Sequence, residues 1–245
     1  MVVKNQLKFI KSLQQKKYRN EYGLFVAEGI KTVGTLLGSH YQVENIYTTQ
    51  ADALSFDAAK TELISQKELT QMSGMQHPNT VLAVFHIPKP RPIDYGSWIV
   101  ALDTIADPGN LGTIIRLCDW FGIESLVCSL NTVDCYNPKV LQATMGSIAG
   151  VNIGYTDLTS FCANADVPIY GAFMDGKPVY SEDLTQPGIL LMGNEANGIS
   201  AELEALVTQR ISIPKFGGHA TESLNVAMAT AILLNEIRRG ERQGP

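Results

Sequence analysis

The sequence predicts an α/β protein, in which a small N-terminal α/β unit precedes a larger unit built on a parallel sheet. Three observations favour this class. From residue 97 onward, short runs rich in Ile, Val and Leu alternate with helical patterns, as in parallel sheets covered on both faces. A proline-rich stretch at 88–96 separates the two parts. Hydrophobic residues make up 45% of the 245 residues and charged residues 18%, which is typical of globular proteins.

The first 87 residues mix helical and strand patterns. Leu7, Ile10 and Leu13 recur at helical spacing with lysines between them, which predicts one basic helix over 4–18. Further helices are expected at 29–37 and 66–72, and strands at 24–27, 43–48 and 81–85. These elements predict a small α/β or α+β domain over 1–87.

The part from 97 to 245 is more regular. Short apolar runs predict strands at 98–102, 125–128, 169–172, 189–192 and 211–213. Helical patterns separate them at 111–121, 138–145, 200–207 and 223–239. In sheets of this kind, ligands bind outside the carboxyl ends of the strands, so the loops that follow strands are the candidate sites.

Charge is spread unevenly along the chain. The net charge is −5, yet residues 1–31 carry seven basic and two acidic side chains, a local charge of +5. Such asymmetry is compatible with a basic binding face on an acidic body. A solvated face of an amphipathic helix is the alternative interpretation.

Several classes of protein are disfavoured by the sequence. No apolar run approaches the roughly 18 residues of a membrane span, and the N-terminus lacks the apolar core of a secretory signal, so we expect a cytoplasmic protein. No CxxC pair and no cysteine–histidine zinc spacing occur. We therefore expect no metal site, and reduced, buried thiols at Cys118, Cys128, Cys135 and Cys162.

The first candidate loop leads from a strand into a helix through Asp107-Pro-Gly-Asn110. Asn110 is predicted to cap the helix at 111–121, whose free amides suit an anionic ligand. Arg116 lies off the predicted buried face of that helix. It either pairs with Asp119 three residues later or binds a phosphate or ribose. The GxGxxG spacing of a dinucleotide site is missing.

The second and third loops also follow predicted strands. In Gly193-Asn-Glu195-Ala-Asn-Gly198, Gly193 permits close approach of a ligand, and Glu195 is either a functional or a solvated acid. Ser200 is predicted to cap the next helix. The third loop runs from Ile213-Pro to Ser223-Leu-Asn225-Val-Ala. Taken alone, it predicts an N-cap at Ser223 and a first-turn residue at Asn225.

Together the three loops resemble motifs 1, 2 and 3 of the SpoU (TrmH-type) RNA ribose methyltransferases, which belong to the SPOUT superfamily. The matching patterns are Asp-Pro-x-Asn-x-Gly-x-x-x-Arg, Leu-x-x-Gly-x-Glu-x-x-Gly-Ile and Ile-Pro followed by Ser-Leu-Asn-Val-Ala. Near the N-terminus, Lys16-Lys-Tyr-Arg19 and Gly23-Leu-Phe-Val-Ala-Glu-Gly29 resemble the start of the RNA-binding domain of many members.

The resemblance implies transfer of a methyl group from S-adenosyl-L-methionine to a ribose 2′-hydroxyl of tRNA or rRNA. It also implies a homodimer and a SPOUT-type catalytic domain over 97–245 with a C-terminal trefoil knot. The implied catalytic residues are Asn110, Arg116, Glu195, Ser223 and Asn225. The implied cofactor-binding residues are Met192, Gly193, Gly198, Ile213 and Leu224.

The residue types suit this chemistry. Arginine stays protonated, so we expect Arg116 to hold the phosphate beside the target ribose and to stabilise charge on the 2′-oxygen. Asn110, Glu195 and Asn225 would orient Arg116 and the ribose. With RNA as the implied substrate, five basic side chains become predicted phosphate contacts, namely Lys8, Lys11, Lys16, Lys17 and Arg19.

One departure and three alternatives stay open at the level of sequence. The stretch Lys215–Glu222 is longer than in the family, and His219 within it is interpreted as a solvated loop residue. The alternatives are a SPOUT enzyme that methylates a base, an RNA-binding module without catalysis, and an unrelated nucleotide-binding α/β enzyme. The last is disfavoured because both GxGxxG and GxxxxGK[ST] are missing.

Overall fold

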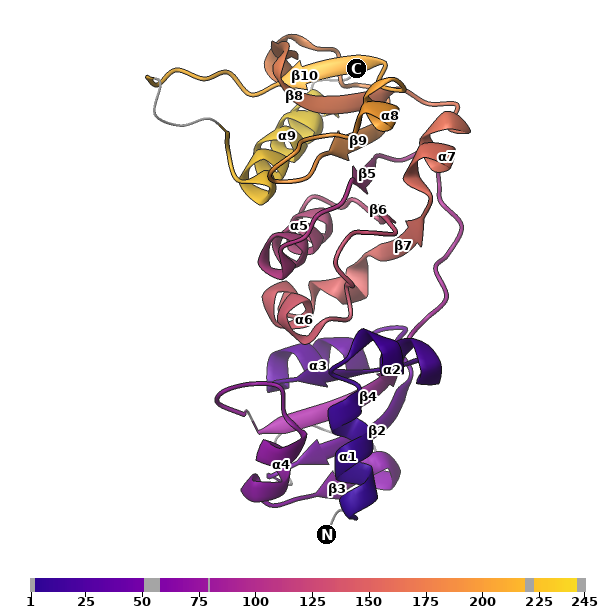
Figure 1. Ribbon diagram of the computed structural model, residues 1–245, viewed down its shortest axis with the longest axis vertical. Coiled ribbons are helices and arrows are strands. Elements are labelled where there is room, and N and C mark those ends of the chain that lie inside the picture. Colours follow the sequence, from indigo (N-terminus) through magenta and orange to yellow (C-terminus); the bar gives the residue numbers. More distant parts are fainter. Residues whose placement is uncertain (1–2, 51–57, 79, 219–222, 242–245) are drawn as a thin grey trace. The chain divides into compact units, whose positions relative to one another are not determined.

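The computed structural model describes residues 3–50, 58–78, 80–218 and 223–241. The chain divides into two compact units (Figure 1). The N-terminal unit comprises Met1–Lys89 together with Asp134–Ala149, and the sheet unit comprises Pro90–Val133 with Gly150–Pro245. Each unit is described by itself below.

The N-terminal unit contains a four-stranded sheet in the order β1-β4-β2-β3. Its pairs are antiparallel except for the parallel pair β2–β3. The strands are β1 (Leu24–Glu28), β2 (Val43–Thr48), β3 (Thr61–Leu63) and β4 (Val81–His86). The helices are α1 (Lys4–Ser12), α2 (Lys16–Tyr22), α3 (Ile30–Leu37) and α4 (Gln66–Met72), with the short 3-10 turn η1 (Ala58–Lys60).

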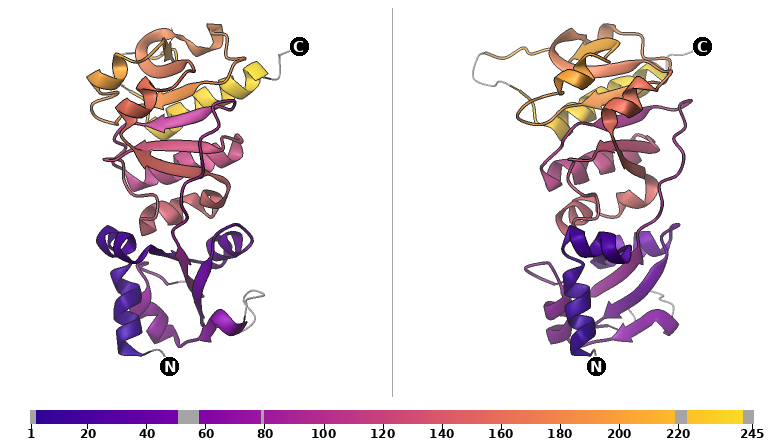
Figure 2. Two further views of the ribbon diagram at one scale, coloured as in Figure 1. Left: turned by 90° about the vertical axis from the view of Figure 1, so that its right-hand side faces the viewer. Right: turned by 45° about the vertical axis from the view of Figure 1, so that its right-hand side comes forward.

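Helices cover both faces of this sheet (Figure 2), and β1 and β4 are therefore buried on both sides. Ile10 and Leu13 from the first helix region, with Leu69 and Met72 from α4, pack on one face in a single apolar cluster. Helix α3 contacts β1 and β4 from its own buried face. This burial accounts for the continuous apolar runs in the two strands.

The single basic helix expected over 4–18 is instead two helices. The backbone leaves the helical region at Gln15, where φ is −100° and ψ is 134°, before α2 begins at Lys16. The break leaves the carbonyls of Leu13 and Gln14 needing donors, and Arg19 supplies them from Nη1 at 2.9 Å each. The apolar spacing predicted helix correctly, but it contained no signal for this interruption.

Arg19 is a correction to the predicted RNA contacts. Its side chain is only 2% exposed, and its guanidinium pairs with the carboxylate of Asp134 through Nε and Nη2. A guanidinium that is buried and has four of its five donors bonded inside the N-terminal unit is not accessible to a phosphate. The other four predicted contacts, Lys8, Lys11, Lys16 and Lys17, are exposed.

The N-terminal unit also contains residues 134–149, which the sequence assigns to the 97–245 domain. This segment carries α6 (Pro138–Thr144), which packs against β1. The Tyr136 ring lies 4.6 Å from the Phe25 ring, and the Tyr41 ring lies 5.6 Å from Phe25. Burial raises the pKa of Tyr41 to about 12. An aromatic cluster therefore holds the segment to the N-terminal unit.

The sheet unit is built on six strands in the order β10-β8-β9-β5-β6-β7, all paired in parallel. The strands are β5 (Ile99–Leu102), β6 (Ser125–Ser129), β7 (Asn152–Thr156), β8 (Ile169–Pro178), β9 (Ile189–Met192) and β10 (Gln209–Ser212). Its helices are α5 (Pro108–Trp120), α7 (Leu158–Ala163), α8 (Ala201–Glu204) and α9 (Val226–Glu241), with the short turn η3 (Val179–Ser181). The short turn η2 (Ser147–Gly150) falls almost wholly in segment 134–149 of the N-terminal unit. The parallel α/β class is thus confirmed.

Two helical pairs cover the two faces of the parallel sheet. Helices α5 and α9 pack together, and α7 packs with α8 over an apolar cluster that includes Ile99, Leu191 and Leu203. Strand β7 and helix α7 were not predicted. In the case of β7, the strand is half-buried at the sheet edge and has few apolar residues. The order places β5 between β6 and β9, so the loops that follow β5 and β9 leave the sheet as neighbours.

Two further expectations concern the whole chain. The four cysteines, all in the described ranges, form no disulfide and are buried, as predicted, and burial raises the pKa of Cys162 to about 11. Within the described ranges, no helix combines the length and apolar character that a membrane crossing requires.

Candidate functional site

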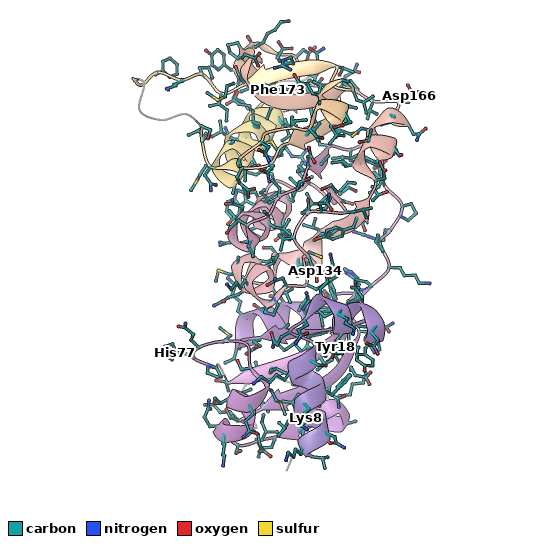
Figure 3. All side chains as sticks on the ribbon, in the orientation of Figure 1. Lys8, Tyr18, His77, Asp134, Asp166 and Phe173 are labelled. Atoms are coloured by element: carbon teal, nitrogen blue, oxygen red, sulfur yellow. The ribbon has the colours of Figure 1, made fainter. Side chains whose placement is uncertain are left out.

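A cavity of about 1020 Å³ lies at the carboxyl ends of β9 and β10 and against the middle of β8. Its walls come from the end of β9 and the turn after it, from the end of β10 and the loop after it (211–218), and from α9 and the residues just before it. Phe173, labelled in Figure 3, contributes from β8. The structure places all five predicted cofactor residues in this lining, namely Met192, Gly193, Gly198, Ile213 and Leu224.

The turn after β9 forms one wall of this cavity. Asn194 and Gly198 exchange two backbone hydrogen bonds of 2.8 and 2.9 Å, and Gly198 has a φ of +70°. A Cβ atom on Gly193 would stand 2.3 Å from the backbone of Gly198. Gly193 was expected to let a ligand approach the backbone. The structure shows that glycine is required there because the backbone at Gly198 already lies too close for a side chain.

A second pocket of about 500 Å³ adjoins the first and shares part of its wall. The shared residues lie in the turn after β9 and at the start of α9. Four of the five predicted catalytic residues line this second pocket: Asn110, Glu195, Ser223 and Asn225. A large cavity and a smaller pocket that contains the predicted polar side chains therefore lie side by side.

Asn110 has a different place in α5 from the one predicted. Asp107 is the N-cap, since its carboxylate accepts from the Asn110 N–H at 2.8 Å, and Pro108 occupies the first helical turn. The Asp-Pro pair was the signal for this, because proline favours the first position of a helix. The Asn110 side chain is thereby released from capping, and its Nδ2 donates to Glu195 Oε1 at 2.8 Å.

The start of α9 also differs from the prediction. Asn225, not Ser223, caps this helix, because its Oδ1 accepts from the N–H groups of Ala227 at 3.0 Å and Met228 at 3.3 Å. Its Nδ2 donates to Asn110 Oδ1 at 2.9 Å. Ser200 does stand at the N-cap position of α8, without a side-chain hydrogen bond to that helix.

These contacts form one chain of hydrogen bonds with a defined direction. It runs from the first amides of α9 to Asn225, then to Asn110 and then to Glu195. Because each amide oxygen is occupied by a donor, the orientation of both asparagines is fixed, and each nitrogen keeps a second N–H. The site thus offers fixed donors beside a carboxylate, which is suited to orienting a hydroxyl group.

Arg116 is the predicted catalytic residue that the structure does not bring into either pocket lining. It is exposed on α5, and in the described part of the chain it forms no ion pair with Asp119. Its guanidinium is therefore not committed to the i,i+3 pair that was the alternative role.

Two remaining expectations concern metals and the long loop. Among the described residues, no group of three His, Cys, Asp or Glu side chains could hold a metal ion. His219 lies outside the described residues, as do its neighbours up to Glu222. Residues 215–218 of the long loop contribute to the lining of the larger cavity.

Comparisons with known proteins agree with this fold. The model of the SpoU rRNA methylase family matches residues 97–235, and that of an MRM3-like substrate-binding domain matches residues 4–83. A 23S rRNA (guanosine(2553)-2′-O)-methyltransferase of Bacillus subtilis is 30% identical over 96% of this chain and 97% of its own length.

Solved structures resemble the whole chain. A TrmH-family protein from Porphyromonas gingivalis has a TM-score of 0.89 at 37% identity, covering 98% of this chain and 99% of its own. An AdoMet-bound rRNA methyltransferase from Sinorhizobium meliloti has a TM-score of 0.87 at 30% identity, covering 98% and 97%. The family match and these likenesses define the class as an α/β methyltransferase. The family model matches more than half of the sequence, and the chain belongs to the SpoU rRNA methylase family.

Proposed function

We propose that this protein transfers the methyl group of S-adenosyl-L-methionine to a ribose 2′-hydroxyl of tRNA or rRNA. The observation that carries the proposal is the pair of adjoining pockets in a SpoU-family chain. A relative that spans the chain is named a 2′-O-methyltransferase, and a similar solved structure is named as AdoMet-bound. The larger cavity, of about 1020 Å³, has a size that suits a nucleoside-like cofactor.

In this proposal the larger cavity holds the cofactor, which supplies a methyl group already activated on a sulfonium. Met192, Gly193, Gly198, Ile213 and Leu224 are its proposed contacts, because all five line the cavity. The smaller pocket receives the ribose, and the wall it shares with the cavity brings the acceptor oxygen beside the methyl group.

The residues of the smaller pocket have defined tasks in this scheme. Asn110 and Asn225 use their second N–H groups to orient the ribose, while Glu195 fixes Asn110. Ser223 adds a hydroxyl to the same wall. Arg116 holds the phosphate beside the ribose and stabilises negative charge as the 2′-oxygen gains the methyl and loses its proton to that phosphate or to water. Its permanent charge prevents it from acting as the base.

The N-terminal unit is the proposed RNA-binding part. It carries the match to the substrate-binding family model, and Lys8, Lys11, Lys16 and Lys17 are exposed on α1 and α2, with Lys8 labelled in Figure 3. We assign these four lysines to phosphate contacts. The proposed domain bounds remain 1–87 for RNA binding, 88–96 for the linker and 97–245 for catalysis, with a trefoil knot in the last.

A homodimer in the cytoplasm is part of the same proposal. Leu224, Met228 and Ile232 recur at four-residue spacing at the start of α9 and along it, and each is between 40% and 62% exposed. Trp120, at the end of α5, is 83% exposed, and α5 packs on α9. Exposed apolar residues on neighbouring helices support a contact with a second copy of the chain.

Calorimetric titration with S-adenosylhomocysteine tests the cofactor half of the proposal, and labelled methyl transfer to bulk rRNA and tRNA tests the rest. We expect saturable binding, and a product that resists alkaline cleavage at the modified nucleotide because its 2′-oxygen is blocked. A methylated product that remains alkali-sensitive would indicate base methylation. RNA binding without binding of S-adenosylhomocysteine would indicate a module without catalysis.

A further inference from the structure

Asp103 follows β5 directly and is a buried carboxylate with no part in the proposed chemistry. Its side chain is 6% exposed. Oδ2 accepts from the backbone N–H of Ser200 at 2.8 Å, and Oδ1 accepts from the Thr104 hydroxyl at 2.9 Å. Burying a carboxylate is costly unless hydrogen-bond donors surround it, and these two donors meet that need. The role of the buried carboxylate is what requires an explanation.

Thr104 has an unusual backbone. Its φ is +56°, a left-handed value that is costly for a β-branched residue and persists only when its surroundings hold it. Three hydrogen bonds do so: its N–H donates to Ser129 Oγ at 2.8 Å, its hydroxyl donates to Asp103, and its carbonyl accepts from Asn194 Nδ2 at 2.6 Å. This conformation places the Thr104 carbonyl where the Asn194 amide reaches it.

The segment 194–200 is therefore held at both ends by two consecutive residues. Asn194 at its start binds Thr104, and Ser200 at its end binds Asp103. Between them, Asn194 Oδ1 also accepts from the N–H groups of Ala196 and Asn197 at 2.9 and 3.1 Å. This segment lines the larger cavity, whereas the loop that continues from Thr104 leads to Asn110 in the smaller pocket.

We propose that Asp103 and Asn194 are positioning residues that latch the cofactor-lining segment 194–200 to the catalytic loop after β5. The latch, formed by Asp103, Thr104, Asn194 and Ser200, sets the shape of the cofactor wall and the distance from Glu195 to Asn110 at once. Neither positioning residue has to touch the methyl group or the ribose to do this. The inference rests on the proposed function, because it assigns the cavity to the cofactor.

Substitutions at Asp103 separate its hydrogen bonds from its charge. Asp103→Ala removes both contacts and leaves the Ser200 N–H without an acceptor. Asp103→Asn keeps both, because its oxygen still accepts from Ser200 and its NH₂ donates to the Thr104 hydroxyl, which can also accept. A positioning role therefore predicts that Asn restores what Ala loses.

Substitution at Asn194 separates the latch from the turn. Asn194→Asp keeps an oxygen acceptor for Ala196 and Asn197 but sets a carboxylate oxygen against the Thr104 carbonyl. The turn is retained while the link to Thr104 is broken.

Helix α7 provides matched controls outside both pocket linings. The Asp157 carboxylate accepts from the backbone N–H of Ser160 at 2.8 Å, and Asn164 Nδ2 donates to the Ser160 carbonyl at 2.7 Å. Asp157→Ala and Asn164→Asp thus remove the same two kinds of contact elsewhere in the sheet unit.

The experiment measures the dissociation constant of S-adenosylhomocysteine by calorimetry, and hydrogen exchange of the Ser200 amide without added ligand. We expect Asp103→Ala and Asn194→Asp to weaken binding at least about tenfold, and Asp103→Ala to accelerate the exchange by at least about tenfold. Asp103→Asn and the two α7 controls should stay within about threefold of wild type in both readouts.

Two results would overturn the latch. One is wild-type affinity and wild-type exchange in Asp103→Ala. The other is an Asp103→Asn protein as impaired as Asp103→Ala, which would assign the effect to the negative charge. Failure of the wild-type protein to bind S-adenosylhomocysteine would instead count against the proposed function, and Ser200 exchange would still decide whether the latch exists.

Discussion

Asn110, Glu195 and Asn225 act at the residue scale through one chain of hydrogen bonds that begins at the first amides of α9. Its direction follows from helix capping: once Asn225 accepts from the helix, its nitrogen can only donate onward. Arg116 lies outside this chain and both pocket linings. Its proposed contribution is charge, which can be removed without disturbing the chain.

Arg116→Ala should lower kcat by about 10² to 10³-fold, since a fixed charge near the developing oxyanion is lost. The affinity for S-adenosylhomocysteine should remain that of wild type, because the residue does not line the cofactor cavity. Single-turnover methyl transfer and calorimetry measure the two quantities. Equal losses of rate and cofactor affinity would argue against a role confined to the RNA and the transition state.

Arg19 is a residue whose importance should appear in stability. Arg19→Met removes the guanidinium partner of the largely buried Asp134 carboxylate and the donor to two backbone carbonyls, so unfolding should be about 3 kcal/mol easier. Denaturant unfolding monitored by circular dichroism measures this. Lys16→Met, an exposed change at the start of α2, is the control and should stay within about 0.5 kcal/mol of wild type. Matching curves for the two variants would refute the buried pair.

At the scale of elements, the break between α1 and α2 determines which basic side chains face solvent. Because α2 restarts at Lys16, Arg19 turns inward, whereas the lysines of the two helices remain exposed. The sequence pattern therefore predicted a basic helical region, whereas the break between the helices determines which of its basic side chains are exposed.

Replacing Lys8, Lys11, Lys16 and Lys17 with glutamine should weaken RNA binding and flatten its salt dependence. The slope of log K against log salt should fall by up to about 3, since each phosphate contact on single-stranded RNA contributes about 0.7. Filter binding across a salt series measures the slope. Lys177→Gln in the sheet unit is the control, and an unchanged slope in the fourfold variant would remove these helices from the RNA-binding face.

At the scale of the whole molecule, the exposed apolar residues of α5 and α9 are explained by a second copy of the chain. Met228→Asp combined with Ile232→Asp should convert a dimer into monomers, because burying two unpaired carboxylates is strongly unfavourable. Light scattering coupled to size exclusion measures the mass. Gln71→Glu adds a charge at an exposed position of α4, outside α5 and α9, and should leave the dimer intact. A monomeric wild-type protein would refute the proposed interface.

Stability at alkaline pH is a second property of the whole molecule. Burial raises the pKa of Tyr41 to about 12 and that of Cys162 to about 11, whereas both groups ionise near pH 9 to 10 when unfolded. A raised folded pKa means that stability is fully present below the unfolded pKa and is lost as pH rises toward the folded one. The denaturant concentration at the unfolding midpoint should thus decrease as the pH is raised from about 9 to 12. Tyr41→Phe should flatten this fall, and an unchanged profile would contradict the assignment.

The sequence by itself determined the parallel α/β class, most helix and strand positions, and the chemical types at the site, because apolar periodicity and loop motifs are local properties. Only the tertiary structure decided which polar groups meet. Asn110 joins Asn225 from 115 residues away and Glu195 from 85, while Asp107 takes over the cap that local pattern assigned to Asn110. The burial of Arg19 and the attachment of 134–149 to the N-terminal unit likewise depend on contacts between segments that are far apart in the sequence. Hydrogen bonds and packing between distant segments satisfy groups that local sequence leaves open, so their partners exist only once the chain is folded.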